Sequence, residues 1–130
     1  MKKYLMLSLS LIAALVLTGC AKKNVLDVNM AEFVFSPADF KVSAGQEVTL
    51  NLTNSGAVLH QFVIMKLGTS ATIPFDDDDL ANVYWEQEVE PGASKTVTFT
   101  APSEPGEYEV VCKSGGHLEN GMKATLTVVP

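Results

Sequence analysis

The chain has 130 residues, 47% of them hydrophobic, with a formal net charge of -6 and no arginine. This length accommodates one domain around one buried core and leaves no room for a second domain. The negative charge excludes proteins that bind nucleic acid or anionic lipid headgroups through a basic surface, because like charges repel.

The N-terminal segment is typical of an export signal. Lys2 and Lys3 precede an apolar run over residues 5–17, which is shorter than the roughly 20 residues that a transmembrane helix needs. The run ends at Leu17-Thr18-Gly19-Cys20, which resembles the signal of a bacterial lipoprotein with Cys20 as the lipidated first residue. An uncleaved N-terminal anchor or an ordinary secretory signal is the alternative interpretation.

The lipoprotein interpretation divides the chain into three parts. We expect residues 1–19 to be a signal peptide, residues 20–24 to be the lipidated N-terminus and a tether, and residues 25–130 to be one folded domain. A lipid on Cys20 would prevent a disulfide with Cys112, the second of the two cysteines. Cys112 would then be a lone thiol in an oxidising compartment, where binding to a metal would protect it.

The folded part has the pattern of an all-β protein. Apolar residues recur at every second position in short segments, and glycine, proline and asparagine separate the segments. Candidate strands lie at residues 25–30, 39–43, 47–54, 60–66, 94–100, 106–112 and 123–129. These features predict an antiparallel sandwich or barrel in which helix contributes little.

Residues 68–90 are the least regular part of the chain. Four aspartates, Asp76 to Asp79, precede an apolar run, and this arrangement suits the positive N-terminus of a short helix. We expect a short helix or loop insertion near residues 74–86. A calcium loop lacks its alternating acidic residues and glycine here, so the remaining alternatives are a partner-docking patch and a solvated surface.

Four side chains form a candidate metal site. Cys112, His117 and Met122 follow one another at intervals of five residues, and His60 is the only other histidine. Side chains two apart in a strand share a face, so His60, Cys112 and Met122 should all point inward at strand ends. One thiolate, two imidazoles and one thioether are the ligands of a blue copper site, whose soft sulfur suits Cu(I) and whose nitrogen suits both oxidation states.

Each of these residues also has a purely structural interpretation. His60 could be a core histidine bonded to backbone, Cys112 a small buried hydrophobe and Met122 a gap filler at a strand end. Zinc also accepts Cys and His, although a thioether would add little to its binding. The joint pattern and its spacing favour copper.

The chain resembles the cupredoxins, the small blue copper proteins, over residues 25–129. The resemblance rests on Phe35-Ser36-Pro37, on Asn54 before His60, and on the spacing of Cys112, His117 and Met122, which is most similar to that of the auracyanins, with azurins and plastocyanins as more distant relatives. It implies a Greek-key sandwich with copper at one end. It also implies that His60, Cys112 and His117 are equatorial ligands and that Met122 is the axial one.

Two positions depart from the family pattern. Gln61 stands where an asparagine usually tethers the ligand loop, and Gly115-Gly116-His117 replaces a frequent Pro-Gly-His. Hydrogen bonds around the ligands tune the metal, so Gln61, Lys113 and Ser114 are candidates for this tuning. His117, on a glycine-flanked loop beside Leu118, is the candidate exit for an electron.

Together with the lipoprotein signal, the resemblance implies a membrane-anchored electron carrier that cycles one copper between Cu(II) and Cu(I). Its partners would be a membrane cytochrome complex or a c-type cytochrome, and it would act as a monomer at the outer face of the cytoplasmic membrane or within the periplasm. An enzyme is not expected, because a copper oxidase or nitrite reductase needs further histidines and the chain has two. An exported copper carrier or chaperone without an electron-transfer role, and a surface lipoprotein without metal, are the alternatives.

Overall fold

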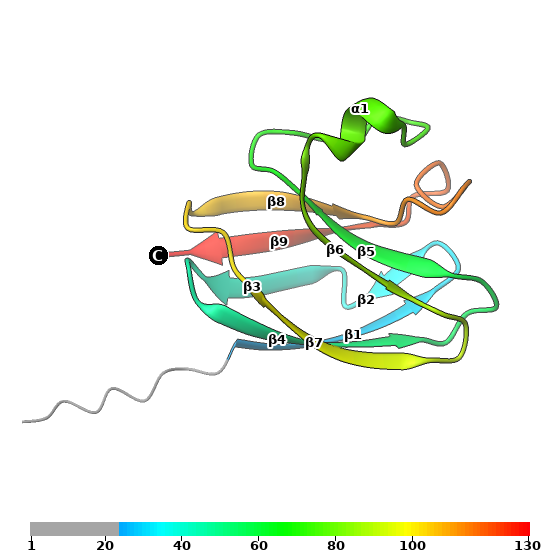
Figure 1. Cartoon of the computed structure of the whole chain (residues 1–130), viewed down its shortest axis with the longest axis horizontal. Helices are drawn as coiled ribbons and strands as arrows, with labels where there is room; N and C mark the ends of the chain where they lie inside the picture. The colour runs from blue at the N-terminus through cyan, green and yellow to red at the C-terminus, as the bar shows by residue number, and fades with distance from the viewer. Residues whose placement is uncertain (1–23) are drawn as a thin grey trace, which may run out of the picture.

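The computed structural model describes residues 24–130, which form two packed β-sheets with one short helix at the side (Figure 1). The predicted all-β sandwich is confirmed. The elements are β1 (Asn24–Ala31), β2 (Val34–Ser36), β3 (Asp39–Ser43), β4 (Glu47–Asn54), β5 (His60–Met65), α1 (Asp77–Leu80), β6 (Val83–Val89), β7 (Ser94–Thr100), β8 (Gly106–Val111) and β9 (Lys123–Val129). The expected signal peptide and Cys20 lie outside the described residues. Within residues 24–130, no helix is long and apolar enough to cross a membrane.

The sheets have the orders β2-β1-β4-β7 and β3-β9-β8-β5-β6. Strands β3, β4, β7 and β9 begin and end where the alternation of apolar residues predicts. The pairing is not antiparallel throughout, because β1 runs parallel to β4 and β3 runs parallel to β9. Alternation has the same period in both kinds of pairing, so it does not reveal strand direction.

The irregular segment after residue 68 contains both a helix and a strand. Asp76 caps α1: its carboxylate accepts a hydrogen bond from the Asp78 N–H at 2.9 Å, and its own N–H donates to Asp79 at 3.0 Å. The expected helix is therefore present. The expected insertion ends at Val83, where β6 starts as an edge strand of the larger sheet. Gln87 on the half-buried face of β6 interrupts the apolar alternation, which explains why the sequence did not predict this strand.

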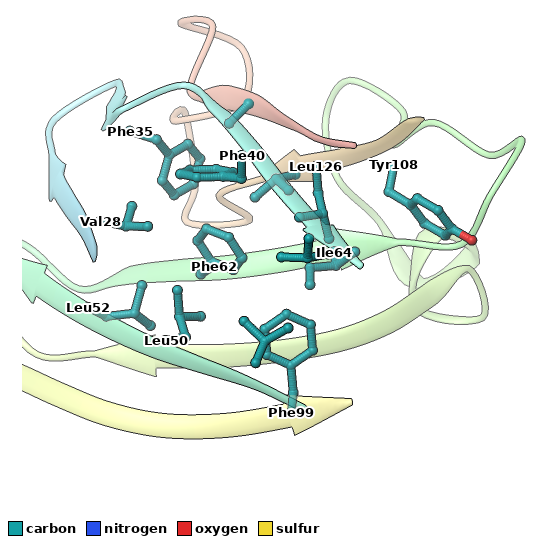
Figure 2. Close-up of a cluster of buried hydrophobic side chains, with 14 of the residues drawn as sticks. Val28, Phe35, Phe40, Leu50, Leu52, Phe62, Ile64, Phe99, Tyr108 and Leu126 are labelled. Atoms are coloured by element: carbon teal, nitrogen blue, oxygen red, sulfur yellow. The ribbon is translucent and has the colours of Figure 1, made fainter. Parts of the chain in front are cut away.

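The main core lies between the two sheets, where three aromatic rings meet (Figure 2). The Phe62 ring packs edge-on against Phe35, with ring centroids 5.7 Å apart, and lies 5.5 Å from Phe40. Trp85 on β6 is partly buried and stacks on Phe99, with ring centroids 4.7 Å apart. Cys112 and Met122 belong to the same buried cluster, so the core is continuous with the candidate metal site.

Candidate metal centre

The candidate ligands gather at one end of the sandwich, where the loop after β8 (orange) lies beside the turn between β1 and β2 (cyan; Figure 1). His60 is the first residue of β5, Cys112 directly follows β8, and Met122 directly precedes β9. His117 belongs to the loop between β8 and β9. Rigid strand ends therefore carry three of the four side chains, and one short loop carries the fourth.

Three donor atoms form a compact triangle. The Nδ1 atoms of His60 and His117 are 3.1 Å apart, and the Cys112 Sγ lies 3.4 Å from the Nδ1 of His117 and 3.8 Å from that of His60. The strand alternation predicts inward-facing side chains, and His60, Cys112 and Met122 are each 0% exposed. His117 is 7% exposed, so its ring is the part of the site nearest to solvent.

Backbone hydrogen bonds hold the loop that carries His117. The His117 N–H donates to Ser114 O at 2.9 Å, and the Met122 N–H donates to His117 O at 3.0 Å. The Cys112 N–H donates to Met122 O at 3.2 Å, which joins the two ends of the loop. Gly116 and Gly121 have φ angles of 81° and 87°, in the left-handed region that glycine adopts without a steric penalty.

Gln61 and Ser114 tie the ligand loop to β5. The Ser114 hydroxyl lies 2.8 Å from both Gln61 Oε1 and Leu59 O, two acceptors on the strand side. The Gln61 backbone N–H donates to the Cys112 sulfur at 3.4 Å, and the Gln61 side-chain amide lies 3.7 Å from it. The Gln61 side chain thus connects β5 to the ligand loop through Ser114, although an asparagine was expected at this position.

Two other sequence candidates lie further from the donor atoms. The Lys113 ammonium binds Glu86 on β6 at 2.6 Å, so its charge is held at the outer sheet edge. Leu118 is 4% exposed and packs with Val63, Met65 and Val111 in a second apolar cluster. Leu118 therefore supports the ligand loop from the inside.

The turn between β1 and β2 contributes two contacts that the sequence did not predict. Oε1 of Glu32 lies 4.0 Å from Nε2 of His60, and the Phe33 ring packs edge-on against His117, with centroids 5.6 Å apart. Phe33 has a φ of 66°, which is unusual for a residue with a side chain. Neither residue lies near a ligand in the sequence, so the sequence gives no signal for these two contacts.

The protonation of the site follows from its burial. Desolvation, followed by the nearby His117, lowers the pKa of His60, while Glu32 acts in the opposite direction. The pKa of Glu32 is itself lowered, chiefly because its carboxylate accepts a hydrogen bond from the Ala57 N–H. Near neutral pH, the site therefore combines a neutral His60 with an ionised carboxylate beside it.

The donor triangle fits a metal ion. An ion about 2.0 Å from each nitrogen and about 2.3 Å from sulfur, in a trigonal plane, separates nitrogen from nitrogen by about 3.5 Å and nitrogen from sulfur by about 3.7 Å. The measured separations are 3.1 Å, 3.4 Å and 3.8 Å. Two imidazoles, one thiol and a buried methionine nearby form the soft, mixed set that copper prefers.

A family model described as a cupredoxin-like domain matches residues 4–128. The chain belongs to the cupredoxin-like family. Auracyanin-B of Chloroflexus aurantiacus is 46% identical over 46 residues, which make up 35% of this chain and 19% of that protein. The match thus spans about a fifth of the curated relative's length.

Solved auracyanins have the same fold as this cupredoxin. The dithionite-reduced auracyanin of Roseiflexus castenholzii superposes with a TM-score of 0.68 at 27% identity, over 83% of this chain and 98% of that one. Auracyanin A of Chloroflexus aurantiacus, described as a blue copper protein, gives 0.65 at 26% identity, over 81% and 98%. The predicted likeness to auracyanins is confirmed. The family and the donor set together identify the cofactor as one type 1 copper.

Proposed function

We propose that this cupredoxin is an electron carrier that passes one electron at a time between redox partners and is not an enzyme. The observation that carries the proposal is the preformed donor set: the ligand atoms of His60, Cys112 and His117 lie within 4.8 Å of one another and are buried. A copper ion bound there supplies a one-electron couple between Cu(II) and Cu(I). Electron transfer makes three further demands, which the protein itself must meet.

The first requirement is a site that stays the same in both oxidation states. His60 and Cys112 sit at the ends of paired strands, and the loop between β8 and β9 is closed by hydrogen bonds between Cys112, His117 and Met122. The Gln61 N–H bond to the Cys112 sulfur fixes the direction of that side chain. Such a scaffold resists rearrangement when charge is added or removed, and this keeps electron transfer fast.

The second requirement is a route to the surface. His117 is the most exposed of the four ligand residues, and its ring contacts Phe33, which is 46% exposed. We place the electron exit at the His117 ring edge, with Leu118 buried beneath the same loop. His60 is fully buried and serves as a fixed ligand.

The third requirement is a location near the partners. We propose that lipid on Cys20 anchors the exported chain at the outer face of the cytoplasmic membrane or within the periplasm. The acidic chain, with its net charge of -6, suits a basic partner such as a c-type cytochrome or a membrane cytochrome complex. Labelling cells with a radioactive fatty acid tests the anchor: the wild-type chain should take up label and Cys20→Ala should not.

A redox titration tests the carrier function. The copper-loaded protein should give a reversible single-electron wave, and it should keep its copper over repeated cycles in the presence of an external chelator. A copper carrier, the alternative function, would release the ion to the chelator within the same time. The complete burial of His60 and Cys112 favours retention.

A further inference from the structure

One nitrogen of the metal site has no hydrogen-bond partner. Among the buried side-chain nitrogen and oxygen atoms of residues 24–130, the Nε2 of His60 is the one left unpaired. The Nδ1 of the same ring points at the donor triangle, 3.1 Å from the Nδ1 of His117. When Nδ1 is a ligand, the neutral ring carries its proton on Nε2, and that buried N–H requires an acceptor.

A carboxylate lies close to this nitrogen. Oε1 of Glu32 lies 4.0 Å from the His60 Nε2, about 1 Å beyond hydrogen-bond length, so a small movement of this half-exposed side chain would bring the two atoms into contact. The Ala57 N–H donates to the same Oε1 at 2.5 Å and so holds the carboxylate at the edge of the site. The Glu32 side chain is 42% exposed, so the contact closes the outer side of a fully buried imidazole.

The loop between β4 and β5 leaves room for this contact. A Cβ atom on Gly56 would lie 2.6 Å from the Glu32 Oε1 and 2.8 Å from the His60 Nε2, so a side chain there would push the two groups apart. The Gly56 N–H donates to the Asn54 Oδ1 at 2.9 Å, and the Asn54 amide donates to Val58 O and Val89 O. The buried asparagine thus fixes the loop in the conformation in which glycine is required.

We propose that Glu32 is a positioning residue for the copper ligand His60. A shift of about 1 Å lets its carboxylate accept the Nε2–H, which keeps Nδ1 free for the metal, and its negative charge stabilises Cu(II) more than Cu(I). Carboxylate partners of this kind orient histidine ligands and raise their basicity in other metal sites. The inference rests on the proposed copper site and concerns what tunes it.

Two variants of Glu32 and one control variant separate the effect of the Glu32 charge from the effect of its hydrogen bond to His60. Glu32→Gln keeps an acceptor but removes the charge, and Glu32→Ala removes both. Glu47→Gln is the matched control, because Glu47 is an exposed residue at the start of β4, whereas the site adjoins the strand's other end. The readouts are the midpoint potential and, in the diamagnetic Cu(I) protein, the solvent exchange of the His60 Nε2–H by NMR.

Both Glu32 variants should lose Cu(II) affinity relative to Cu(I) by about tenfold or more, which raises the potential by about 59 mV for a one-electron couple. The Nε2–H should stay protected in Glu32→Gln and exchange rapidly in Glu32→Ala. Potentials and exchange rates equal to those of Glu47→Gln would overturn the assignment. If the wild-type protein forms no blue copper site at all, the proposed function itself fails, and the two failures are thereby distinguished.

Discussion

The tether between Ser114 and Gln61 offers a quantitative test of how the ligand loop is held. Ser114 has one hydroxyl proton and faces two acceptors at 2.8 Å, Gln61 Oε1 and Leu59 O. One net hydrogen bond contributes about 0.5–1.5 kcal/mol to stability. We expect Ser114→Ala to lower the free energy of unfolding by about 1 kcal/mol, and Gln61→Ala to have an effect of similar size.

A double-mutant cycle isolates the interaction between the two side chains. The copper-free single and double variants are unfolded in urea, and the coupling energy should be about 0.5–1 kcal/mol, because the two residues share one contact. Thr53 and Ser94 form a matched control pair, with their hydroxyls 3.1 Å apart on the exposed face of the other sheet. Their coupling should be smaller, because water competes for exposed hydroxyls.

The same variants should also change the copper site. Loss of the tether loosens the loop that carries His117, so the thiolate absorption band of the copper protein should broaden or shift in Ser114→Ala and not in Ser94→Ala. The reasoning is refuted if Gln61→Ala and Ser114→Ala are additive within about 0.3 kcal/mol and leave the copper spectrum unchanged.

Two further predictions concern the scaffold. Phe62→Ala removes a fully buried ring that packs against Phe35 and Phe40, and should lower the free energy of unfolding by about 3–5 kcal/mol in thermal or urea denaturation; a loss below 1 kcal/mol would contradict the described core. Burial alone would raise the pKa of Asp79, but hydrogen bonds from Asp76 and Thr72 outweigh it and lower the pKa. The ionised Asp79 carboxylate therefore stabilises the fold at pH values above the pKa that Asp79 has in the unfolded chain. This stabilisation disappears as the pH falls through the lower pKa of the folded protein. Asp79→Asn should unfold more easily at pH 7, with a difference from wild type that shrinks below about pH 4; a difference independent of pH would count against this role.

The sequence predicted the strands whose alternation is regular. The run from Val48 to Leu52 contains one apolar residue at every second position, and β4 has the predicted bounds. It did not predict β6, where Gln87 occupies an inward position, or β2, which has three residues. Period-two alternation depends on one-sided burial, so an edge strand with polar residues on its inner face gives no such signal.

The ligands were predictable because their spacing is local and their residue types are rare. His60 could be assigned because the chain has two histidines and His60 starts a regular apolar strand. The partners of the ligands were not predictable in the same way. Glu32 meets His60 only because β1 runs parallel to β4 and ends beside the following loop, and strand direction is not encoded in the alternation.

The most direct test of the central claim is the absorption spectrum on addition of Cu(II) to the copper-free protein. We predict an intense blue charge-transfer band from the Cys112 thiolate at one copper per chain, and its complete loss in Cys112→Ala. A colourless protein, or a blue band that persists in Cys112→Ala, would contradict the assignment of a type 1 copper site.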